Sequence, residues 1–154
     1  YRKSYLRVRR LQKIMARVKI TLPKVFLFET KIRVRIDDIN YGGHLGNERI
    51  LSFSQEVRLQ FLKSSGFTEL DFGGVGLIMT EAMVSYKAEA FQNDVLTVRM
   101  GVDEVSNRSF DFVYEFVNQE GILVALAKTS MMAFNYDTRK IASLPSDAKT
   151  LLNG

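Results

Sequence analysis

Residues 37–67, DDINYGGHLGNERILSFSQEVRLQFLKSSGF, join a glycine-rich loop to a long helical pattern. The loop, residues 37–47, holds the chain's only histidine, two adjacent carboxylates and three glycines. Apolar residues then recur at intervals of three or four, which predicts a helix of roughly 18 residues that ends at Gly66. The main stripe comprises Ile50, Phe53, Val57 and Phe61. A second stripe through Leu51 and Leu62 indicates a helix enclosed on more than one side.

Strand patterns lie on both sides of this helix. Before the loop, ETKIRVRI, residues 29–36, alternates apolar and basic side chains, so Ile32, Val34 and Ile36 are expected on a buried face. After the helix, β-branched and aromatic residues fill four segments, with short breaks between them that predict antiparallel hairpins. The four segments are residues 76–91, 94–105, 108–118 and 122–136. Pro145 ends the last strand, and SDAKTLL, residues 146–152, is expected to form one final helical turn.

The composition fits one globular domain and excludes several classes of site. The chain has 154 residues, of which 46% are hydrophobic and 25% charged. It has no cysteine, which excludes disulfides, thiolate metal sites and a cysteine nucleophile and favours a reducing, cytoplasmic location. A single histidine excludes metal motifs that need two imidazoles. No run of 18 or more apolar residues occurs, so no membrane span is predicted.

The net charge of +5 comes from the N-terminal segment, residues 1–24. This segment contains nine Lys or Arg and no acidic residue, whereas residues 25–154 carry 13 basic and 17 acidic residues. Three interpretations are open: a targeting peptide, an arm that binds a polyanion, or sequence upstream of a start at Met15. Alternatively, residues from about 15 onward form a first edge strand. Residues 25–154 are predicted to form a single domain, and nucleic acid is not expected as its partner.

Residues 35–67 resemble the first half of the hotdog-fold acyl-CoA thioesterases of the 4-hydroxybenzoyl-CoA thioesterase type. That family has a D-x-D-x-x-G-H-V-N-N loop and an Ala-Arg pair near the middle of the helix. The matching positions here are Asp38, Asn40, Gly43, His44, Asn47 and Val57-Arg58. YKAEAFQNDVLTV, residues 86–98, resembles the family's Y-x-x-P-A-x-x-G-D-x-L strand pair. The resemblance spans roughly residues 25–145 and implies an α+β hotdog fold, with one long central helix wrapped by a curved antiparallel sheet.

A thioester hydrolase needs a group that polarises the carbonyl and a base that delivers water. Unpaired backbone N–H groups at a helix N-terminus can stabilise a developing oxyanion, and Leu45 to Asn47 are expected at that position. Glycines allow a ligand to approach the main chain closely. The substrate-binding candidates are therefore Tyr41, Gly43, Gly46 and Asn47.

The attacking group is less obvious, because this chain has Asn40 where the resembling enzymes have the second acid of D-x-D. An asparagine cannot accept the proton, although it can hold a water or orient the thioester carbonyl. Three other residues are candidate bases: Asp38 just upstream, His44 near neutral pH, and Glu56 if burial beside the apolar face raises its pKa. The catalytic candidates are thus Asn40, His44, Asp38 and Glu56.

Each candidate also has a purely structural interpretation. Asp38 in a turn often accepts a hydrogen bond from a nearby backbone N–H, and His44 can hold the loop in shape. Glu56, near Arg49 and Gln60, can be a solvated or salt-bridged side chain. Asn47 is the economical choice for the helix N-cap, a role that is compatible with lining a site.

The sequence therefore predicts an acyl-CoA thioesterase that hydrolyses a thioester to a carboxylic acid and coenzyme A. The alternative is a non-catalytic protein that binds acyl-CoA or an acyl carrier, which Asn40 favours. The resemblance implies a homodimer, with a homotetramer as a further assembly, and a site shared between one subunit's loop and helix and the other's strands. It implies no metal or redox cofactor.

Overall fold

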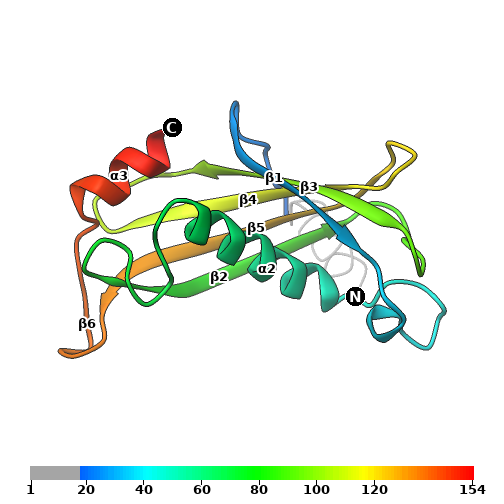
Figure 1. Ribbon diagram of the computed structural model, residues 1–154, viewed down its shortest axis with the longest axis horizontal. Coiled ribbons are helices and arrows are strands. Elements are labelled where there is room, and N and C mark those ends of the chain that lie inside the picture. The colour runs from blue at the N-terminus through cyan, green and yellow to red at the C-terminus, as the bar shows by residue number, and fades with distance from the viewer. Residues whose placement is uncertain (1–17) are drawn as a thin grey trace, which may run out of the picture.

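The computed structural model describes residues 18–154 and contains a twisted antiparallel sheet with a long helix across one face (Figure 1). The strand order is β1-β3-β4-β5-β2, and the short strand β6 pairs with the last two residues of β5, Phe134 and Asn135. The strands are β1 (Phe26–Arg33), β2 (Gly76–Tyr86), β3 (Val95–Asp103), β4 (Ser109–Val117), β5 (Leu123–Asn135) and β6 (Lys140–Ile141). The predicted α+β arrangement of one helix and one sheet is confirmed.

The long helix α2 (Arg49–Ser64) follows the loop as predicted, although it begins two residues later than Asn47. Its main apolar stripe is buried against the sheet, and the Phe61 ring meets the Phe112 ring edge-on at 6.0 Å. Gly66 has φ of 79°, so the left-handed residue expected at the helix end is present. The second stripe is enclosed only in part, because Leu62 is buried whereas Leu51 is 37% exposed.

Strand β4 forms the centre of the core. Its alternate residues Phe110, Phe112, Tyr114 and Phe116 face the helix and are fully buried. On the opposite face Glu115 pairs with Arg99, and Asp111 pairs with Lys128 at 2.5 Å. The sheet therefore has the apolar and polar faces that strand alternation requires.

The N-terminal part of the described chain differs from the prediction. Residues 18–25 form no strand, so the edge strand expected from about residue 15 is absent from this stretch, and residues 1–17 lie outside the described residues. Strand β1 begins and ends three residues earlier than expected. Val34 is buried, but Ile36 is exposed because residues Ile36–Asp38 turn into a short 3-10 helix, η1.

Strands β2 and β3 do not form the predicted hairpin, since β2 pairs with β5 and β3 pairs with β1. Residues 87–94 instead form a crossover between the two sides of the sheet. The N–H groups of Lys87 and Ala88 donate to the Val124 carbonyl oxygen at 2.8 and 3.1 Å. Farther along, the Leu45 N–H donates to the Ala90 carbonyl oxygen at 2.8 Å. The crossover is thereby held against the loop of residues 37–47.

The chain ends in helix α3 (Ser146–Asn153), which is longer than the single turn expected. Ala148 and Leu152 on this helix are buried. Among the helices of residues 18–154, none is both long enough and apolar enough to cross a membrane.

Candidate functional site

The loop before α2 is a tight turn closed by main-chain hydrogen bonds. Ile39 and Leu45 form an antiparallel bridge, and the Asn40 N–H donates to the His44 carbonyl oxygen at 2.9 Å. Gly43, with φ of 80°, adopts the left-handed conformation that glycine tolerates best. The turn thus fixes His44 immediately before the residues that lead into the helix.

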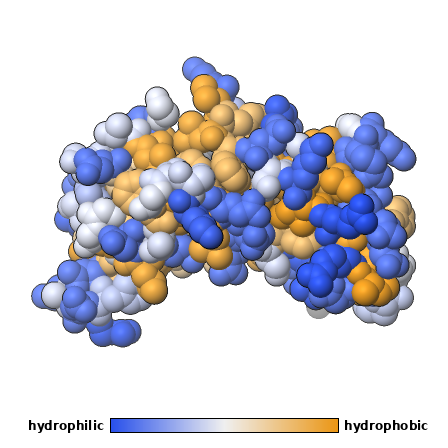
Figure 2. All heavy atoms as spheres, viewed as in Figure 1, coloured by the Kyte–Doolittle hydropathy of each residue, from blue (hydrophilic) through white to orange (hydrophobic). Residues whose placement is uncertain are grey.

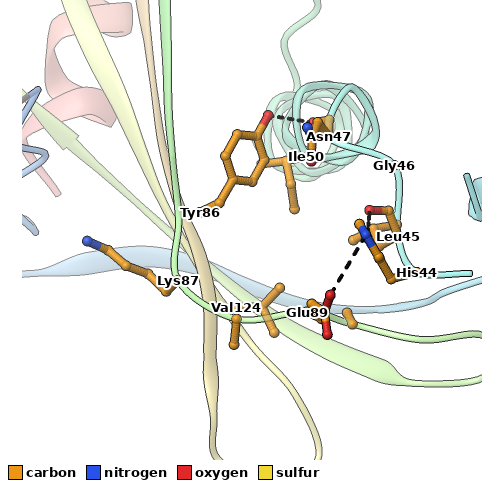
Figure 3. Close-up of a pocket in the computed structure, with 11 residues that line it drawn as sticks. His44, Leu45, Gly46, Asn47, Ile50, Tyr86, Lys87, Glu89 and Val124 are labelled. Atoms are coloured by element: carbon orange, nitrogen blue, oxygen red, sulfur yellow. Dashed lines mark hydrogen bonds and ion pairs between the residues drawn. The ribbon is translucent and has the colours of Figure 1, made fainter. Parts of the chain in front are cut away.

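A cavity of about 300 Å³ opens where this loop, the start of α2 and the end of β2 meet (Figure 3). Three regions of the chain that are distant in sequence supply its walls. The lining residues are His44, Leu45, Gly46, Asn47, Ile50, Tyr86, Lys87, Ala88, Glu89, Ala90 and Val124. Apolar side chains from the helix and β5 combine with the polar groups of His44, Tyr86 and Glu89, as is common for small-molecule sites.

The start of α2 has unpaired main-chain donors, and Asn47, which carries one of them, lines this cavity. The N-cap residue is Glu48, with φ of −67° and ψ of −22°, and its side chain makes no capping hydrogen bond. The prediction that Asn47 is the N-cap is therefore wrong. Within residues 18–154 the N–H groups of Asn47 and Glu48 have no hydrogen-bond acceptor, whereas the Gly46 N–H donates to the Asp38 carbonyl oxygen at 2.9 Å. Of the two N–H groups expected to hold an oxyanion, only that of Asn47 is free.

Tyr86 connects β2 to the start of the helix. Its hydroxyl donates to the Asn47 carbonyl oxygen at 2.8 Å, across the mouth of the cavity (Figure 3). Partial burial and the nearby Glu48 carboxylate raise the pKa of Tyr86 above its ordinary value. The hydroxyl is therefore a proton donor at neutral pH, and it holds the strand and the helix end at a fixed separation.

His44 and Glu89 lie close together where the loop meets the crossover. The His44 Nε2 lies 3.8 Å from the Glu89 Oε1, and the His44 Nδ1 lies 3.1 Å from the Leu45 carbonyl oxygen (Figure 3). Since a carbonyl oxygen can only accept, this contact favours the tautomer with a proton on Nδ1. The Nε2 lone pair then points toward the cavity and Glu89.

Asp38 has the structural role that was the alternative to a catalytic one, because it accepts a backbone hydrogen bond in the turn. Its carboxylate is buried, accepts a hydrogen bond from the Arg35 N–H at 2.8 Å, and lies 3.6 Å from the Arg49 Nε. The Arg49 guanidinium also donates to the Asp37 carbonyl oxygen at 2.5 Å. Asp38 does not line the cavity, so the geometry assigns it to fastening the loop onto the helix.

Four other predicted residues also lie outside the cavity wall, namely Asn40, Tyr41, Gly43 and Glu56. Asn40 is half-buried, and its Oδ1 accepts a hydrogen bond from the Gly42 N–H at 2.8 Å, which closes the turn. Tyr41 is fully exposed in that turn and does not line the cavity, so its role in substrate binding stays a prediction. Glu56 is exposed and accepts a hydrogen bond from Gln60 at 2.7 Å, so the burial that would tune it as a base is absent.

The sequence-based prediction missed Tyr86 and Glu89 as site residues. Both belong to the YKAEAF segment, which was recognised only as part of a strand pair. The available signal was an acid and a tyrosine grouped at the end of a β-strand, immediately before a break. No group of three His, Cys, Asp or Glu side chains in the described part of the chain is arranged to hold a metal ion.

The long helix on a curved antiparallel sheet matches the fold of solved hotdog-fold thioesterases. The model of the thioesterase-like superfamily matches residues 34–152, and the chain belongs to this superfamily. This membership supports thioester hydrolysis as the general chemistry of the protein.

Individual relatives cover most of the chain. A protein of Aquifex aeolicus strain VF5 is 30% identical over 122 residues, which make up 78% of this chain and 93% of that protein. The long-chain acyl-CoA thioesterase FadM of Escherichia coli strain K12 is 23% identical over 126 residues, or 80% and 96% of the two chains. Slr0204, a 1,4-dihydroxy-2-naphthoyl-CoA thioesterase from Synechocystis, has a crystal structure that matches with a TM-score of 0.75 at 24% identity, covering 82% and 95%. The predicted hotdog fold is confirmed.

Proposed function

We propose that this protein is an acyl-CoA thioesterase that hydrolyses its substrate in the cavity between His44 and the start of α2. The observation that carries the proposal is the unpaired N–H group of Asn47, a residue that lines an open cavity at the start of α2, in a member of a thioesterase superfamily. FadM and Slr0204 act on acyl-CoA thioesters by their names, which supports coenzyme A as the thiol. An acyl carrier protein would offer the same thioester and the same pantetheine arm.

The reaction follows from the positions of these groups. The thioester carbonyl oxygen lies against the Asn47 N–H and the positive end of the helix dipole, which stabilise the oxyanion that forms when water attacks. His44 takes one proton from the water through Nε2 as the oxygen bonds to the carbonyl carbon. The carbon–sulfur bond then breaks, the imidazolium returns the proton to the leaving thiolate, and the acid and the thiol separate. No metal or redox group takes part in this scheme.

A second candidate function is binding of an acyl thioester without hydrolysis. The observation that favours it is Asn40, which cannot act as a base and is already engaged with the Gly42 N–H. In this case the cavity would retain its shape and its affinity for the pantetheine arm, and turnover would be absent.

We also propose that the protein is a homodimer. Among residues 18–154, strand β2 is an edge of the sheet, and its 11 residues have no pairing strand on one side. Exposed edges of this length invite pairing with another chain. Leu51 on α2 and Met79 on β2, which line one shallow hollow, leave apolar surface exposed beside this edge. Figure 2 shows apolar and hydrophilic residues intermixed on the face that carries α2.

Because the chain lacks cysteine, we place it in a reducing compartment such as the cytoplasm.

A hydrolysis screen tests the function directly. Purified protein is incubated with aliphatic and aromatic acyl-CoA thioesters, and thiol release is followed with a thiol-reactive dye. We expect release with at least one substrate class, and a loss of about 10²-fold or more in the His44→Ala variant. Calorimetric titration with a non-hydrolysable acyl-CoA thioether is the companion measurement. Binding without any turnover would establish the second candidate, and neither binding nor turnover would overturn both.

A further inference from the structure

Glu89 is a carboxylate directed at the cavity from the crossover that follows β2. Its neighbours Ala88 and Ala90 are small, and the Leu45 N–H to Ala90 carbonyl hydrogen bond of 2.8 Å sets the crossover opposite the loop. Its side chain is 65% exposed and reaches within 3.8 Å of the His44 Nε2 (Figure 3). No other carboxylate of the described residues lines this cavity. It is therefore placed to take part in chemistry at His44.

The separation of these two groups suits a single bridging water. Hydrogen bonds of this kind are about 2.8 Å long. A water molecule at that distance from both the His44 Nε2 and the Glu89 Oε1 is consistent with the 3.8 Å between them. Such a water would donate one proton to each group, which leaves its oxygen lone pairs free for attack.

Relative to the family pattern, the chain lacks an acid at Asn40 and has an additional one at Glu89. In the two patterns that the chain resembles, the loop acid corresponds to Asn40, and the proline of Y-x-x-P-A corresponds to Glu89. Both positions border His44. A Cβ added at Gly42 would lie 3.1 Å from both the Asn40 Oδ1 and the His44 Nε2, so those atoms are at most twice that distance apart. Of these two positions near His44, position 40 lacks a carboxylate and position 89 has one.

We propose that Glu89 is a catalytic residue that supplies the carboxylate which Asn40 cannot provide. Glu89 accepts a hydrogen bond from the attacking water while His44 takes its other proton, and the oxygen bonds to the thioester carbon. The carboxylate then neutralises the His44 imidazolium until the proton passes to the leaving thiolate. This inference rests on the proposed hydrolase function.

The experiment compares Glu89→Gln with the wild type on the best substrate from the hydrolysis screen. We expect kcat to fall by about 10²-fold or more, with KM and thioether affinity nearly unchanged, because glutamine keeps the shape but not the negative charge. The melting temperature should not change, since the side chain is largely exposed. Glu120→Gln, which changes another exposed loop carboxylate outside the cavity, is the matched control and should retain wild-type kcat.

The double variant Asn40→Asp/Glu89→Gln provides a second, independent test. It places a carboxylate at position 40, the other position near His44, so we expect its activity to be at least tenfold higher than that of Glu89→Gln.

Three outcomes would overturn the proposal. If Glu89→Gln keeps wild-type kcat while His44→Ala loses activity, Glu89 is not catalytic, and the hydrolase function stands. If the loss in Glu89→Gln is matched by an equal loss in thioether affinity, Glu89 only binds substrate. If the wild type hydrolyses no thioester, the proposed function and this inference fail together.

Discussion

Gly42 lies between Asn40 and His44, and its missing side chain leaves room for the imidazole. A Cβ at this position would lie 3.1 Å from the His44 Nε2 and 3.3 Å from its Cδ2. The Gly42 backbone is not left-handed, so alanine is allowed there, and the effect of Gly42→Ala is steric. We expect the ring to shift by a few tenths of an ångström and hydrolysis to fall by roughly threefold to tenfold, because a displacement of about 1 Å at a catalytic group costs about a hundredfold. Steady-state thioesterase kinetics measure this loss.

Gly43→Ala is the matched control for this prediction. Nothing lies within 4 Å of an added Cβ at Gly43, but its φ of 80° disfavours alanine. This variant should lower the melting temperature more than Gly42→Ala does. Equal activity in Gly42→Ala and the wild type would show that the position of His44 is not critical.

Single residues show where sequence reasoning is reliable and where it is not. His44 could be placed in the cavity because its loop precedes a strongly periodic helix. Asn47 was misassigned because capping depends on the backbone angles of the next residue, Glu48, which no composition rule fixes. Glu89 could not be found because its proximity to His44 depends on a contact between segments 45 residues apart in the sequence. The burial of Glu56 was overestimated, because periodicity does not show whether a residue at the border of an apolar stripe is buried or exposed to solvent.

At the level of elements, the C-terminus of α2 gives a prediction about stability. The Phe67 N–H donates to the Leu62 carbonyl oxygen at 2.8 Å across Gly66, whose φ is 79°. Gly66→Ala should destabilise the protein by about 1–2 kcal/mol, because a Cβ disfavours the left-handed conformation. Urea unfolding measures this difference. Gly66→Asn should cost less, and Ser65→Ala, at the preceding residue with φ of −97°, should cost under about 0.5 kcal/mol. An unchanged unfolding midpoint in Gly66→Ala would contradict this view of the cap.

The elements themselves were largely predictable, whereas their pairing was not. Alternation located β2, β3, β4 and β5 to within a few residues, because each strand has one face in the core. The β2–β3 connection was misjudged as a hairpin, since period-two patterning reports which face is buried and not which strand lies alongside. Residues 87–90 of the misjudged connection form one wall of the cavity. Locating the site required the topology.

On the scale of the whole molecule, the edge of the sheet at β2, which has no pairing strand among residues 18–154, supports the proposed dimer. Pairing of β2 with the same strand of a second copy would place the two chains about a two-fold axis and join their sheets. It would also cover Met79, which is 51% exposed, together with the apolar surface of Leu51. The cavity walls described above come from one chain, so His44 and Glu89 lie at one site whether or not the protein dimerises.

Sedimentation tests the dimer with a paired substitution. The wild type should sediment at twice the 17.6 kDa of one chain, and Met79→Lys should shift the protein toward monomer, because it adds a charge to an apolar edge. Leu70→Lys, at an exposed apolar residue outside β2, is the control and should remain dimeric. A wild type that stays monomeric at all concentrations would contradict the dimer. Activity of the Met79→Lys monomer then decides the remaining question: retained hydrolysis would mean that one chain holds the complete site, and lost hydrolysis in a folded monomer would mean that the partner's strands complete it.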